Sequence, residues 1–93
     1  MDAKTILGHL EAVAEQLGVE IRYEPMEDET ALSPGGLCRI RDKQVIIVNS
    51  RAPARDQVGT LVKALRRLEL NQIYLRPGIR DLLEGEIVEE ETE

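Results

Sequence analysis

Apolar residues recur at helical spacing near the start of the chain. They are Ile6, Leu7, Leu10, Val13, Ala14 and Leu17. Three- and four-residue steps place them on one face of a helix. Gly18 follows and suits a left-handed C-terminal cap because it has no Cβ. The pattern predicts a helix over residues 2–17.

Residues 19–24 alternate apolar and charged side chains before Pro25. This period is typical of a half-buried strand, and Pro25 ends it because proline lacks a backbone donor. The acidic run at 27–29 and the Ser-Pro-Gly-Gly run at 33–36 then predict an irregular loop.

A hairpin is predicted over residues 38–48. Cys38 and Ile40 alternate with arginines, Asp42-Lys43 can form a turn, and residues 45–48 are all β-branched. Four consecutive apolar residues cannot share one face of a sheet. We therefore expect the second arm to be a central strand covered on both sides, between the first strand and the Cys38 arm.

A second helix is expected to run to about Leu70. Asn49 and Ser50 are candidate caps, and Pro53 is tolerated in a first turn. Its apolar face comprises Val58, Leu61, Val62, Leu65 and Leu68. Arg55, Lys63, Arg66 and Arg67 fall on the opposite, solvent-facing side.

The C-terminal part predicts a short extended segment and a short helix. Residues 73–75 are apolar, and Arg76-Pro77 closes them because a residue before proline avoids the helical region. Ile79, Leu82 and Leu83 can share one face of a two-turn helix that Gly85 ends. Residues 86–93 are mainly acidic and predict a disordered tail.

Together these elements predict an α+β fold in the order α-β-β-β-α-α. We expect a three-stranded, mainly antiparallel sheet, two long helices packed against it, and a short C-terminal helix closing one edge. Residues 1–85 form the expected single domain.

Composition limits the setting of this domain. The 93 residues are 42% hydrophobic without Trp or Phe, so the core must be aliphatic. The longest apolar run, residues 45–48, is far below the ~20 residues of a membrane span, and no signal-peptide centre is evident. The single cysteine, Cys38, fits a reducing compartment. We expect a cytoplasmic protein without a membrane partner.

Charge is distributed unevenly along the chain. Residues 39–80 hold ten basic and three acidic side chains, whereas residues 81–93 hold seven acidic and no basic ones. Residues 1–38 are also acidic, with eight acidic and two basic side chains. The middle is therefore basic and the ends acidic.

The chain lacks the residue sets of the common catalytic sites. A zinc site needs three or four ligands, mainly His and Cys, and only His9 and Cys38 are present. His9 lies beside the first helical stripe and is interpreted as a solvent-edge or partly packed histidine. Gly35-Gly36 lacks the rest of a phosphate-binding motif. We predict no catalytic residue, metal or cofactor.

The basic side chains form the candidate interaction or anion-binding set. Its members are Arg39, Arg41, Arg51, Arg55, Lys63, Arg66, Arg67, Arg76 and Arg80. Nucleic acid is a poor fit because the net charge is −6 and Tyr23 and Tyr74 are the only aromatic residues. These charges can also simply keep a helix soluble or neutralise the acidic tail.

Residues 43–49, Arg55 and residues 60–67 resemble part of the ImmA/IrrE-like zinc peptidases. In that family a strand ending in Asn precedes a helix in which Thr-Leu leads into H-E-x-x-H. Aligned on Thr60-Leu61, the zinc histidines fall on Lys63 and Arg67, and the general-base glutamate on Ala64. The resemblance thus implies a metal-free relict of that fold. Gly35 to Arg39 and Tyr74 to Arg80 are also similar to small bacterial proteins without an assigned activity.

Two functional hypotheses follow from the sequence. The first is a non-enzymatic domain that binds another protein or itself, since arginine is frequent at interfaces and Leu32, Leu37 and Leu75 lie near loops. The second is a site for a small anion or nucleotide at the start of the second helix. There Ser50, Arg51 and free backbone donors can meet a negative group.

Overall fold

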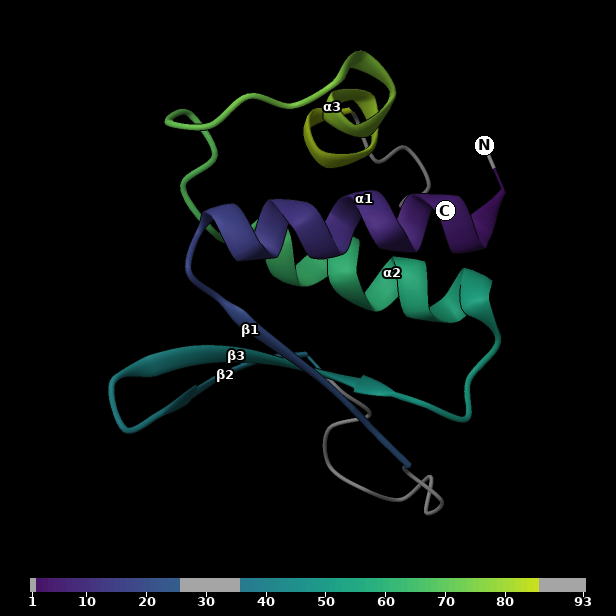
Figure 1. Ribbon diagram of the computed structural model, residues 1–93, viewed down its shortest axis with the longest axis vertical. Coiled ribbons are helices and arrows are strands. Elements are labelled where there is room, and N and C mark those ends of the chain that lie inside the picture. The colour runs from purple at the N-terminus through teal and green to yellow at the C-terminus, as the bar shows by residue number, and fades with distance from the viewer. Residues whose placement is uncertain (1, 26–35, 86–93) are drawn as a thin grey trace, which may run out of the picture.

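A computed structural model describes residues 2–25 and 36–85 of the chain (Figure 1). Its elements are α1 (Ala3–Gln16), β1 (Glu20–Glu24), β2 (Gly36–Ile40), β3 (Lys43–Asn49), α2 (Ala54–Leu65) and α3 (Pro77–Glu84). The predicted α+β class and the element order are confirmed. Residues 27–35 of the predicted loop, which include Leu32, and the predicted tail at 86–93 lie outside the described residues. Gly36, the last residue of that predicted loop, is instead the first residue of β2.

Both ends of α1 follow local rules. The Asp2 carboxylate accepts a hydrogen bond from the Thr5 backbone N–H at 2.9 Å, which satisfies one of the donors left free at a helix start. At the other end Gly18 has a φ of 76°, so the predicted left-handed position is confirmed. That reversal directs the chain into β1.

The sheet has the strand order β1-β3-β2. The predicted central position of residues 45–48 is therefore confirmed, together with both of its neighbours. The prediction of a mainly antiparallel sheet is wrong, because β3 pairs antiparallel with β2 but parallel with β1. β1 ends and β2 begins at the same end of the sheet, on opposite edges. A strand that returns antiparallel to β2 must then run parallel to β1.

The turn between β2 and β3 lies one residue earlier than predicted. Arg41 and Asp42 have φ values of 49° and 69°, the signs that a two-residue type I′ turn requires. Lys43 is already paired with Ile40 in the sheet. The right-handed twist of the strands favours this turn, and aspartate tolerates the left-handed region.

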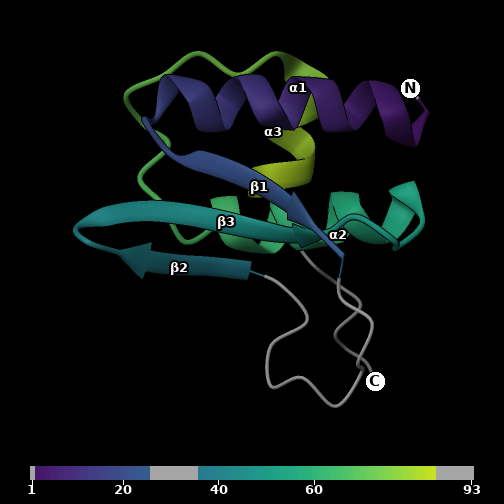
Figure 2. The same ribbon diagram turned by 60° about the horizontal axis from the view of Figure 1, so that its bottom comes forward.

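The molecule has three layers (Figures 1 and 2). α1 and α2 cover one face of the sheet, as predicted, and α3 packs on these two helices on the side away from the sheet. The expectation that the last helix closes a sheet edge is therefore wrong. Ile79 and Leu83, one turn apart on α3, are buried in the hydrophobic cluster that includes residues of both long helices.

The core is aliphatic, as the composition predicts. Its largest fully buried side chains are Leu10, Ile46, Val48, Leu61, Leu65 and Ile79. Ile46 and Val48 belong to the cluster beneath the helices, whereas Val45 alternates to the opposite face of β3 and is still only 3% exposed. Ile47 shares the face of Val45 but is only partly buried and lies outside the core cluster, so the expected burial on both faces is seen at Val45 and not along the whole run.

α2 is shorter than predicted at both ends. Its N-cap is Pro53, and no side chain caps it. Asn49 instead accepts the Arg51 backbone N–H through Oδ1 at 3.0 Å, so the predicted Asn49 and Ser50 caps are wrong. The helix stops at Leu65 because the chain tightens into turns, yet Leu68 still packs against the core.

The residue that follows α3, Gly85, is held by Arg66, the C-cap of α2. The Gly85 backbone N–H donates to the Asp81 carbonyl at 2.8 Å, and the Gly85 carbonyl accepts from Arg66 Nη2 at 2.9 Å. A Cβ at Gly85 would lie 2.2 Å from the Asp81 carbonyl oxygen. The φ of Gly85 is −66°, which any residue can adopt. Glycine is therefore required here by the close approach to Asp81 and not by its backbone conformation.

Gly85→Ala should therefore destabilise the fold by about 1–3 kcal/mol, since the α3 backbone must shift to admit the methyl group. Gly59→Ala is the matched control, because a Cβ there meets nothing within 4 Å. Alanine inside α2 should stabilise by roughly 0.5–1 kcal/mol. Urea unfolding of both variants checks this pair. Equal effects of the two changes would contradict the close contact at Gly85.

Candidate interaction groove

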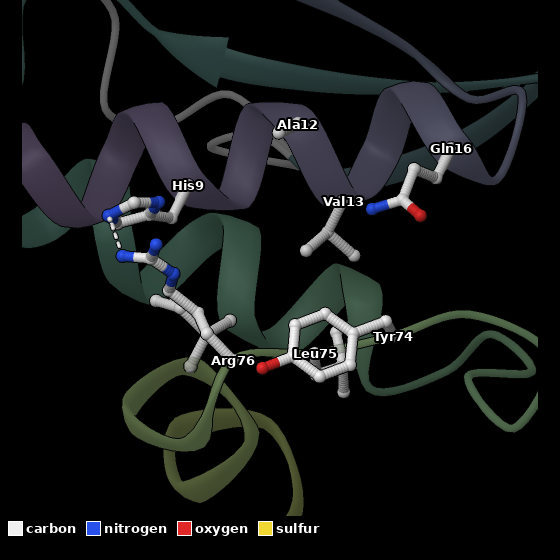
Figure 3. Close-up of a pocket in the computed structure, with 8 residues that line it drawn as sticks. His9, Ala12, Val13, Gln16, Tyr74, Leu75 and Arg76 are labelled. Atoms are coloured by element: carbon white, nitrogen blue, oxygen red, sulfur yellow. Dashed lines mark hydrogen bonds between the residues drawn. The ribbon is translucent and has the colours of Figure 1, made fainter.

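A shallow hollow lies between α1 and the segment that leads into α3 (Figure 3). We call it the Tyr74 groove. Its lining residues are His9, Ala12, Val13, Gln16, Tyr74, Leu75, Arg76 and Ile79. They come from two parts of the chain that are far apart in sequence and adjacent in space.

Extended backbone positions the C-terminal wall of the groove. Leu75 is 2% exposed and anchors the segment in the core. Neighbouring side chains of an extended segment point to opposite sides, so both Tyr74 and Arg76 are exposed. Pro77, the first residue of α3, holds Arg76 in the extended region, with φ −67° and ψ 152°.

The opposite wall is a stripe along α1. His9, Val13 and Gln16 are spaced by four and three residues, which places them along one side of the helix. Arg76 Nη1 lies 3.3 Å from His9 Nε2 (Figure 3), so the two walls touch at this end. A guanidinium can only donate, so Nε2 is the acceptor in this hydrogen bond.

The interior of the groove is apolar and small. Val13, Leu75 and Ile79 are buried beneath it, whereas Tyr74 is 73% exposed at its side. The volume of about 130 Å³ is well below the roughly 300–1,000 Å³ of sites for drug-sized ligands. An engineered apolar cavity of about 150 Å³ accommodates benzene. The groove is thus the size of one apolar side chain.

A second, more open hollow lies where α1 meets β1. Its lining residues are Glu11, Glu15, Val19, Ile21 and Tyr23, and its volume is about 330 Å³. The Tyr23 hydroxyl donates a short hydrogen bond to Glu11 Oε2. Burial, followed by this bond to a carboxylate, raises the pKa of Tyr23 well above its usual range. The polar group of this tyrosine is thus already engaged.

The predicted basic set is spread over several elements. Arg39 is on β2 and Arg41 in the β2–β3 turn, Arg51 precedes α2, and Arg55 and Lys63 lie on α2. These five side chains are exposed. They therefore extend from the hairpin to the helical layer.

The remaining arginines have distinct environments. Arg66 Nη2 donates a hydrogen bond to the Gly85 carbonyl, and its Nη1 is buried without a hydrogen-bond partner among the residues that the structure describes. Arg80 pairs with Glu84 at 3.2 Å. Arg67 is exposed, so of the whole set only Arg76 lines the Tyr74 groove.

The positions aligned with the peptidase motif differ in exposure. Lys63 lies on α2 and Arg67 lies just beyond the end of that helix, and both side chains are exposed. Ala64 is buried, with 3% of its surface exposed. Within residues 2–25 and 36–85, no group of three or more His, Cys, Asp or Glu side chains could hold a metal. No helix in the same ranges is long and apolar enough to cross a bilayer.

The sequence did not single out Tyr74 as a site residue. Instead it favoured Leu37 and Leu75 as apolar residues near loops, but both pack in or against the core. The alternation of outward and inward side chains around Leu75 is the sequence signal that could have identified Tyr74 as exposed. His9 is partly buried, as expected, and its proximity to Arg76 depends on tertiary packing.

Comparison with protein-family models, curated proteins and solved structures found no match for this chain.

The raised pKa of Tyr23 predicts a loss of stability at high pH. Folding holds the phenol proton, whereas the unfolded chain releases it near pH 10. Stability from this group is therefore complete below about pH 10 and falls as the pH rises above it. Tyr23→Phe should flatten that fall, and Tyr74→Phe, at the exposed tyrosine, should flatten it less. Urea unfolding across alkaline pH checks this, and equal slopes in both variants would contradict it.

Proposed function

We propose that this chain is a non-enzymatic, cytoplasmic domain that binds a protein partner through the Tyr74 groove. The supporting observation is an aromatic ring, 73% exposed, beside a hollow whose interior is formed by buried aliphatic residues. Tyr74 is the most exposed large hydrophobic side chain among those described. Covering this ring with a partner stabilises the complex, because apolar surface is removed from water.

The types of residue support a protein partner. Tyrosine and arginine are enriched among the residues that dominate binding energy at interfaces, and both are present here within three positions. Energetic centres of interfaces are pockets that receive one anchoring side chain. The 130 Å³ groove has that size, and a nucleotide would exceed it.

Charge defines the chemistry of the partner further. Arg76 lies at the His9 end, and no carboxylate in the described part of the chain forms an ion pair with it. A partner segment with an aliphatic residue in the groove and an adjacent carboxylate would pair with its guanidinium. We therefore propose an acidic, aliphatic peptide segment as the ligand class.

The alternative is anion binding at the start of α2, near Ser50, Arg51 and Arg55. Asp56 lies in the first turn of α2 and contributes a negative charge there. A carboxylate at this position already stabilises the positive end of the helix dipole and repels an incoming anion. This feature favours the Tyr74 groove over the α2 site.

Selection from a displayed peptide library tests the proposal. Peptides that combine an aliphatic residue with neighbouring carboxylates should be enriched on the immobilised chain. Tyr74→Ala and Arg76→Ala should each weaken binding of a selected peptide by about tenfold or more, measured by calorimetry. Thermal unfolding should change little, because both side chains are exposed.

Arg67→Ala is the matched control, since it removes an exposed arginine outside the groove. Its affinity should equal that of the unmodified chain. Selected peptides that bind all these variants equally would exclude the Tyr74 groove as their site. Enrichment of phosphorylated peptides whose binding depends on Arg51 and Arg55 would support the α2 site instead.

A further inference from the structure

We infer that the Tyr74 groove receives residues 86–89 of a second copy of this chain. This inference rests on the proposed function and identifies the partner. Residues 86–89 are Glu-Ile-Val-Glu, two adjacent aliphatic side chains with a carboxylate on each side. That is the chemistry expected of the ligand from the groove alone.

The apolar match concerns the groove interior. Ile87 and Val88 are β-branched and compact, and either side chain suits a hollow of about 130 Å³ with Val13, Leu75 and Ile79 beneath it. The exposed ring of Tyr74 can cover the inserted side chain from the side. Covering this ring and the groove interior provides the apolar part of the binding energy.

The charge match operates at two scales. Glu86 or Glu89 can pair with Arg76, which has no carboxylate partner in residues 2–25 and 36–85. Over longer distances, residues 81–93 carry seven acidic and no basic side chains, whereas residues 39–80 carry ten basic and three acidic ones. The acidic tail of one copy is therefore attracted to the basic middle of another copy, although each chain is acidic overall.

Reach favours a second copy over the same chain. Gly85 is fixed at the C-terminal end of α3 by Arg66 Nη2 at 2.9 Å. Arg76 is the N-cap at the other end of this helix, about 14 Å away along its axis. Ile87 and Val88 follow Gly85 by two and three residues and reach at most about 7 Å and about 10 Å. The tail of a second copy is not limited by this distance. When the tail of each copy binds the groove of the other, the two copies form a closed dimer.

Sedimentation equilibrium of the full chain tests the inference. We expect a reversible monomer–dimer equilibrium. A tail variant, Ile87→Asp with Val88→Asp, and a groove variant, Tyr74→Ala with Arg76→Glu, should each raise the dimer dissociation constant by about tenfold or more. Arg67→Glu is the charge-matched control for Arg76→Glu and should dimerise like the unmodified chain. Circular dichroism of each variant verifies that it is folded.

Mixing the two impaired variants distinguishes a tail that binds the groove of another copy from a tail that binds the groove of its own chain. The tail variant keeps an intact groove and the groove variant keeps an intact tail. The mixture should therefore form a heterodimer with one tail–groove contact, at concentrations where each variant alone is monomeric. A mixture that stays monomeric, a full chain that is monomeric at every concentration, or a dimer that both variants retain would overturn the inference.

The peptide selection keeps this inference distinct from the proposed function. A monomeric full chain whose groove still selects acidic, aliphatic peptides, with loss in Tyr74→Ala, would overturn the second-copy assignment and leave the groove as a protein-binding site. Selection of no groove-dependent peptide, together with a dimer insensitive to Tyr74→Ala, would overturn both.

Discussion

Burial of Leu75 and Ile79 against α1 is the contact on which the candidate site depends. Leu75 is 2% exposed and Ile79 is 1% exposed, and together they fix the segment before α3 beside the first helix. Because Leu75 points inward from extended backbone, its neighbours Tyr74 and Arg76 must point outward. The same contact thus forms the floor of the groove and presents its two binding residues.

The central strand supplies the platform beneath the helical layer. β3 lies between β1 and β2, and it is connected to only one of them by the two-residue turn. Its pairing with β1 brings together residues separated by about 25 positions. Such non-local pairing becomes favourable only when Ile46 and Val48 are buried beneath α1 and α2. The sheet and the two long helices therefore stabilise each other.

Most of the elements could be predicted from the sequence because their signals are local. The period of Leu7, Leu10 and Ala14 specifies α1, and the β-branched run at 45–48 specifies a central strand. The direction of β1 relative to β3 was missed because it depends on whether β2 begins at the end of the sheet where β1 ends, and this choice leaves no local pattern. The end of α2 was missed because Leu68 still packs against the core from a turn.

The candidate site could be predicted only in part, for the same reason. Arg76 belonged to the expected basic set, but its eight partners in that set lie on other elements or have other contacts. Proximity of Arg76 to His9 joins residues 67 positions apart, which no periodicity reveals. Tyr74 could have been identified from its alternation with Leu75 before a proline. The composition shows only that Tyr74 is one of two aromatic residues in the chain.

Binding of a partner at the Tyr74 groove can be checked by chemical-shift mapping of the ¹⁵N-labelled chain with a selected acidic, aliphatic peptide. The largest shifts should occur in residues 9–16 of α1 and in residues 74–79, the two segments that contain the residues lining the Tyr74 groove. Shifts concentrated instead in residues 50–57, at the start of α2, would contradict it.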